Sequence, residues 1–73
     1  MQYQTKKMRI TGFLKKVVKD LEKEGGVAKK TVLVANISLD LGVSERDIEE
    51  VLETFQKANI LKINELTDDI VIY

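Results

Sequence analysis

Residues 41–47 of the 73-residue chain read Leu-Gly-Val-Ser-Glu-Arg-Asp, a pattern that indicates how two helices are joined. Leu41-Gly42 is typical of the end of a helix, because glycine readily adopts the left-handed conformation of a C-terminal cap. Ser44 can cap the next helix, and Asp47 completes a Ser-x-x-Asp pattern that is similar to a capping box. The stretch therefore predicts one helix, a tight turn and a second helix.

The helix after the turn carries one apolar stripe. Val43 and Ile48 occupy the two positions of a hydrophobic staple, which fixes how the chain enters the helix. The stripe consists of Ile48, Val51, Leu52 and Phe55. Asn59 follows as a left-handed terminator, so the helix is expected to end just before it.

The segment before the turn, residues 31–41, is ambiguous. Leu33, Val34, Ile37 and Leu41 share one helical face. Ile37, Leu39 and Leu41 also alternate with polar residues, which is the period of a strand. We favour a helix, because Leu41-Gly42 ends one.

Two further elements flank this centre. Apolar residues recur at helical spacing over 9–24, and Gly25-Gly26 ends that helix. Its apolar stripe is Ile10, Phe13, Leu14, Val17, Val18 and Leu21. Lys15, Lys19 and Lys23 form a separate row.

Residues 60–63 and 70–73 are β-branched runs around a polar loop, which predicts a hairpin. Residues 1–8 are expected to be a flexible arm before a single domain over 9–73.

The expected fold is α+β, and its core gathers apolar residues from all of these elements. We expect this core to contain Phe13, Leu14, Val17, Leu21, Leu33, Ile37, Leu41, Ile48, Val51, Leu52, Phe55, Ile60, Leu61, Ile63, Val71 and Tyr73.

The composition argues against most catalytic chemistry. The chain has neither cysteine nor histidine, which removes thiolate and imidazole ligands and the usual general base at neutral pH. No Gly-rich phosphate loop is present. We therefore expect no enzyme, metal, cofactor or small-molecule substrate.

No apolar run is long enough for a membrane helix, so a cytoplasmic protein is expected. Abundant Lys, Glu, Ile and Val are compatible with a thermophilic or archaeal source.

The net charge of zero hides an uneven distribution. Residues 1–30 contain nine basic and three acidic side chains, a balance of +6, and residues 31–73 contain three basic and nine acidic ones, a balance of −6. Such a split favours one surface that meets an anion.

The order helix, helix, tight turn, helix, hairpin resembles that of winged helix-turn-helix domains. The residues that carry this resemblance are Leu41-Gly42-Val43-Ser44, Asp47 to Leu52 and Lys57 to Leu61, and it extends over residues 10–73. The general shape is also similar to the C-terminal winged-helix module of archaeal replicative helicases. The resemblance implies a regulator of transcription or replication that places the helix after the turn in the major groove of DNA.

The sequence departs from this family where DNA contacts are expected. The exposed side of the groove helix would present Glu45, Asp47, Glu49, Glu50 and Glu53, and the wing tip Glu65, Asp68 and Asp69. Carboxylates repel DNA phosphates. Double-stranded DNA is therefore expected to meet mainly the basic N-terminal half, through phosphate contacts of little sequence specificity. The expected contacts are Lys6, Lys7, Arg9, Lys15, Lys19, Lys29, Lys30, Thr31, Ser44 and Arg46.

Two alternatives stay open. In a ribbon-helix-helix dimer, residues 7–13 would form a strand that enters the major groove. As a protein-interaction module, the domain would bind a protein partner or a second copy through its acidic third helix. The residues for that role are Glu49, Glu50 and Glu53.

Overall fold

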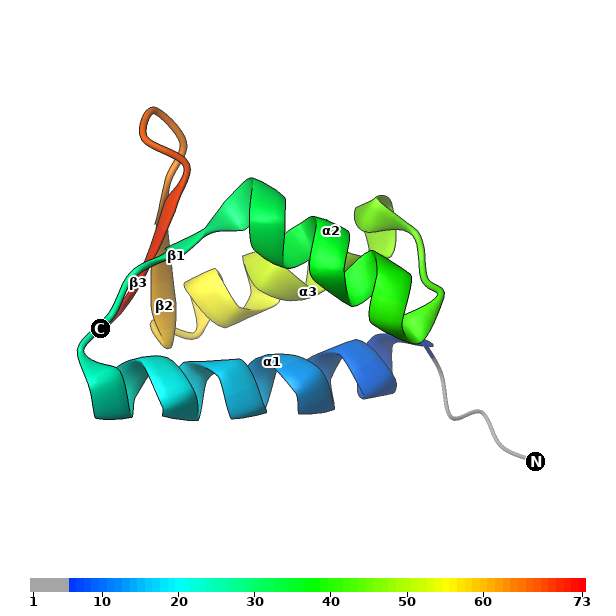
Figure 1. Cartoon of the computed structure of the whole chain (residues 1–73), viewed down its shortest axis with the longest axis horizontal. Helices are drawn as coiled ribbons and strands as arrows, with labels where there is room; N and C mark the ends of the chain where they lie inside the picture. Colours follow the sequence, from blue (N-terminus) through cyan, green and yellow to red (C-terminus); the bar gives the residue numbers. More distant parts are fainter. Residues whose placement is uncertain (1–5) are drawn as a thin grey trace.

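The computed structural model describes residues 6–73, which form three helices and a three-stranded antiparallel sheet. The elements are α1 (Lys6–Glu24), β1 (Ala28–Lys29), α2 (Lys30–Leu41), α3 (Glu45–Lys57), β2 (Leu61–Asn64) and β3 (Asp69–Ile72). Figure 1 shows α1 along one side of the molecule and the β2–β3 hairpin near the C-terminal end of α1. The predicted α+β fold, with a C-terminal hairpin in a winged helix-like arrangement, is confirmed.

Helix α1 begins at Lys6, three residues before the expected start. The expected arm is therefore wrong for residues 6–8, and residues 1–5 lie outside the described part of the chain. The ribbon-helix-helix alternative is also wrong, because residues 7–13 are helical. In the first turn, the Lys7 carbonyl accepts a hydrogen bond from Thr11 Oγ1 (2.7 Å), and Lys7 Nζ lies 2.9 Å from Glu50 Oε1 of α3.

The ambiguous segment is helical, as favoured, and forms α2. Val34 and Ile37 are buried, whereas Leu39 is 83% exposed. The alternating pattern therefore does not correspond to a buried face. Gly42 ends the helix with a φ of 67°, and its N–H donates to the Ser38 carbonyl at 2.9 Å.

The predicted signals around α3 are confirmed. The Asp47 N–H donates to Ser44 Oγ at 3.2 Å, and the staple residues Val43 and Ile48 are both buried. Asn59 has a φ of 61°, so the chain leaves the helix through a left-handed residue. These local contacts fix the angle between α2 and α3.

The sheet has the order β1-β3-β2, with β3 in the centre. Ile70 pairs with Ala28 on one side and with Ile63 on the other. Sequence analysis missed β1, because two residues are too short to show a period. This strand connects α1 to α2 and carries Lys29 to the edge of the wing.

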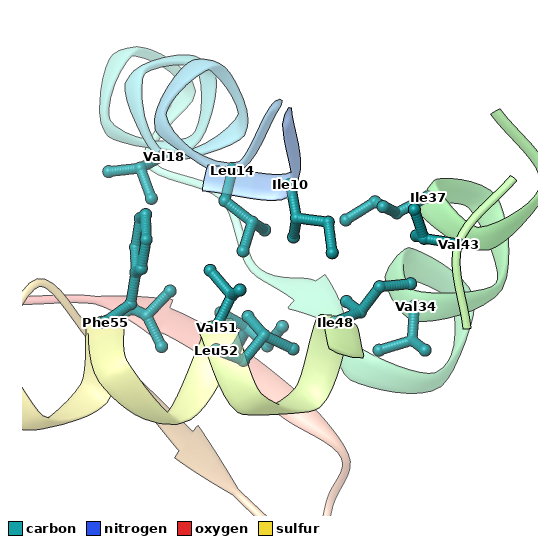
Figure 2. Packing of buried hydrophobic residues seen from close by; sticks show 12 residues of the cluster. Ile10, Leu14, Val18, Val34, Ile37, Val43, Ile48, Val51, Leu52 and Phe55 are labelled. Atoms are coloured by element: carbon teal, nitrogen blue, oxygen red, sulfur yellow. The ribbon is translucent and has the colours of Figure 1, made fainter. Parts of the chain in front are cut away.

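The buried core lies between the three helices and the inner face of the sheet. Figure 2 shows Val18 of α1 opposite Phe55, and Leu14 above Val51. The buried residues are Ile10, Leu14, Val18, Val34, Ile37, Val43, Ile48, Val51, Leu52, Phe55, Leu61 and Ile70. Phe13, Leu33, Leu41 and Ile63 pack against this core and are only partly buried.

The predicted core was wrong in α1, where Ile10 and Val18 are buried instead of Val17 and Leu21, and at residues 70–73. Val71 and Tyr73 were expected inside, but they are 41% and 68% exposed, while Ile70 is buried. Successive strand residues face opposite sides of a sheet, so a shift of one residue exchanges the two faces. Ile60 is also more exposed than expected, at 37%.

Candidate nucleic-acid interface

The wing turns its acidic groups toward the start of α2. Asp68 Oδ2 accepts a hydrogen bond from the Thr31 N–H at 3.0 Å, and its carbonyl accepts one from the Lys30 N–H at 2.8 Å. Free N–H groups at a helix start are satisfied by such acceptors. Asp68 of the wing loop therefore binds the start of α2.

The same wing neutralises two lysines that were expected to contact DNA. Lys29 Nζ lies 2.8 Å from Asp69 Oδ1 and donates to the Thr67 carbonyl at 3.0 Å, and Lys30 Nζ lies 3.6 Å from Glu65 Oε2. Hydrogen bonds from Lys29 and Thr67 hold the pKa of Asp69 below its ordinary value. Lys29 and Lys30 are therefore weak candidates for phosphate contacts.

The exposed side of α3 is acidic in the structure too. Between α3 and the wing lies a hollow of about 380 Å³, whose charged lining is Lys30, Arg46, Glu49, Glu50, Glu53 and Glu65. Glu50 also accepts from Lys7, which raises the pKa of that lysine. Arg46 thus lies among carboxylates, and Ser44 Oγ is used as a helix cap. This surface does not favour a DNA phosphate.

A free basic surface lies on α1, which we call the α1 basic face. It consists of Arg9, Lys15, Lys16, Lys19 and Lys23. All five are exposed, and none forms an ion pair with another residue in the described range 6–73. Arg9, Lys16, Lys19 and Lys23 lie on the side of the helix opposite the buried stripe of Ile10, Leu14 and Val18, and Lys15 lies on the flank of that stripe, because each residue advances about 100° around a helix axis. Gly12 lies on the same outer side of the helix. Apart from its chain neighbours and the backbone of its own helix, no atom of residues 6–73 lies within 4 Å of the position that a Cβ would take there, which leaves room for a ligand to approach the backbone closely.

The expected contacts therefore divide among three places. Arg9, Lys15 and Lys19 belong to the α1 basic face, with exposed Lys6 at the start of that helix, whereas Lys7 is paired with Glu50. Thr31, Lys29 and Lys30 face the wing, and Ser44 and Arg46 lie at α3. Lys23 completes the row that Lys15 and Lys19 form in the sequence, whereas Lys16 was not among the expected contacts. The angle of Lys16 relative to the buried stripe is the signal that would have found it.

Comparison of the chain with protein-family models, curated proteins and solved structures finds no match in any of the three. None of the helices within residues 6–73 is long and apolar enough to span a membrane. In that same range, no three acidic side chains are grouped as a metal site.

Proposed function

We propose that the protein binds double-stranded DNA with little sequence specificity, as a regulator or accessory factor in transcription or replication. The α1 basic face carries this proposal, because its five cations form no ion pair within residues 6–73, whereas Lys7, Lys29 and Lys30 are paired with carboxylates. Phosphate contacts by lysine and arginine supply most of the affinity in non-specific DNA binding. A lack of cysteine is in keeping with a reducing compartment such as the cytoplasm.

The length of α1 supports contact with two phosphate strands. Arg9 and Lys23 are 14 positions apart, which corresponds to about 21 Å along the helix axis. The major groove is about 12 Å wide, so a helix of this length reaches phosphates on both sides of it. The duplex would lie along the outer side of α1, away from the carboxylates of α3.

Fluorescence anisotropy of a labelled 30-base-pair random duplex tests the proposal. The double variant K16Q/K19Q removes two charges from the α1 basic face, and K29Q/K30Q removes two charges that are paired with the wing. At low salt, K16Q/K19Q is expected to lower affinity about tenfold or more. K29Q/K30Q is expected to change affinity much less. Equal losses, or a larger loss for K29Q/K30Q, would contradict the assignment.

The acidic hollow beside α3 favours a second candidate function, the binding of a basic protein segment. Glu49 and Glu53 line it, and Glu53 is only loosely paired with Lys57, at 3.9 Å. E49K/E53K is expected to abolish binding of a lysine-rich peptide and to retain duplex binding. Retained peptide binding would exclude this candidate.

A further inference from the structure

An apolar groove with a basic rim lies between α1 and the connection from α3 to β2. Val18, Phe55 and Ile60 form its floor, and Lys15, Lys16 and Lys19 form its rim. The groove has a volume of about 470 Å³, which is ample for one large aliphatic side chain. Its floor and rim call for a ligand that combines an apolar group with a neighbouring negative charge.

The wing tip has this combination. Leu66 is 97% exposed, and the side chain of Glu65 beside it is 74% exposed. The N–H groups of Leu66 and Thr67 donate to Asn64 Oδ1 at 3.0 and 3.3 Å, and the Asp68 N–H donates to the Asn64 carbonyl at 2.8 Å. The turn is therefore held in one conformation, so little conformational freedom is lost when it binds.

We propose that the wing tip of one copy binds in this groove of a second copy. Leu66 enters the apolar floor, and Glu65 exchanges its 3.6 Å ion pair with Lys30 for the lysine rim of the second copy. Figure 1 shows that the wing tip points away from α1, so a chain cannot fill its own groove. Each copy then offers one wing tip and one groove, which makes the contact head-to-tail and extendable beyond a dimer.

The contact is expected to be weak and sensitive to salt. A single turn in a groove buries less than the roughly 1,200 Å² that a stable interface needs, so association appears only at high protein concentration. The pairing of Glu65 with exposed lysines is screened as ionic strength rises. Self-association would also cover Lys15, Lys16 and Lys19 of the α1 basic face.

Sedimentation velocity over a concentration series, without DNA and at low salt, tests the proposal. L66S removes the apolar tip, and K15E/K16E/K19E reverses the rim. The matched control is L39S, because Leu39 is also exposed but lies on α2. Wild type and L39S are expected to associate as concentration rises, while L66S and the rim variant stay monomeric. Circular dichroism confirms that each variant is folded.

Mixing the two defective variants gives the sharpest result. L66S keeps an intact groove, and K15E/K16E/K19E keeps an intact wing tip, so the mixture is expected to form a heterodimer and nothing larger. The proposal would be overturned if the mixture stays monomeric, if L66S associates as strongly as wild type, or if wild type stays monomeric at every concentration. L66S is expected to keep full duplex affinity, so a loss of self-association can be distinguished from a loss of DNA binding.

Discussion

At the scale of single residues, Asp68 is the main link between the wing and α2. It has a left-handed backbone, with a φ of 64°, and its carboxylate accepts the Thr31 N–H. We expect D68A to lower the free energy of unfolding by about 1–2 kcal/mol, because it removes a cap and places alanine in a strained conformation. Urea denaturation measures this change.

Asn is the matched control at this position. It tolerates the left-handed region and keeps a side-chain oxygen as an acceptor. D68N is therefore expected to retain most of the wild-type stability. A D68N protein as unstable as D68A would show that the negative charge, and not the cap geometry, matters here.

Asp69 gives stability a pH dependence. Its pKa is lowered in the folded protein, so its contribution is fully present above the ordinary carboxyl pKa. The contribution is lost as the pH falls through the lowered pKa. D69N is expected to have a lower urea midpoint than wild type at neutral pH, and the difference is expected to vanish in strongly acidic solution. A difference that grows toward low pH would contradict the assignment.

At the scale of elements, the packing of α1 against α3 holds the molecule together. Leu14 is fully buried, so L14A leaves a cavity, and we expect it to lower the free energy of unfolding by about 2–5 kcal/mol. L39A changes an exposed leucine and is expected to stay within about 0.5 kcal/mol of wild type. Thermal and urea unfolding compare the two. Similar losses would show that Leu39 has a buried partner.

How well each element could be predicted depended on the sequence separation of the contacts that form it. The caps at Gly42 and Ser44 involve neighbours within a few residues, so the sequence patterns were sufficient. Residues 70–73 are four apolar residues in a row, and only pairing with β1 and β2 decides which of them face inward. That pairing could not be read from the sequence, because β1 is only two residues long.

The candidate site shows the same division. The excess of basic residues in the first 30 positions was visible in the sequence. The sequence did not show which of those residues are free of ion pairs, because Lys29 and Asp69 are 40 positions apart and meet only through the sheet. Lys7 of α1 likewise meets Glu50, which lies 43 positions later in α3. Long-range ion pairs therefore determined which basic residues remain available.

At the scale of the whole molecule, the charge is divided between two surfaces. The α1 basic face lies on one long side of the molecule, and four carboxylates lie around the acidic hollow, those of Glu49, Glu50, Glu53 and Glu65. A duplex bound on α1 therefore avoids the surface that winged-helix proteins usually turn to the major groove. We propose that DNA binds in this orientation.

The salt dependence of duplex binding measures how many cations of the α1 basic face contact phosphates. Wild-type affinity for a random 30-base-pair duplex is measured from low to physiological salt. If the five cations of the α1 basic face each neutralise one phosphate, log affinity is expected to fall against log salt with a slope of about −4 to −5. No binding at low salt, or affinity that does not change with salt, would contradict DNA recognition by this surface.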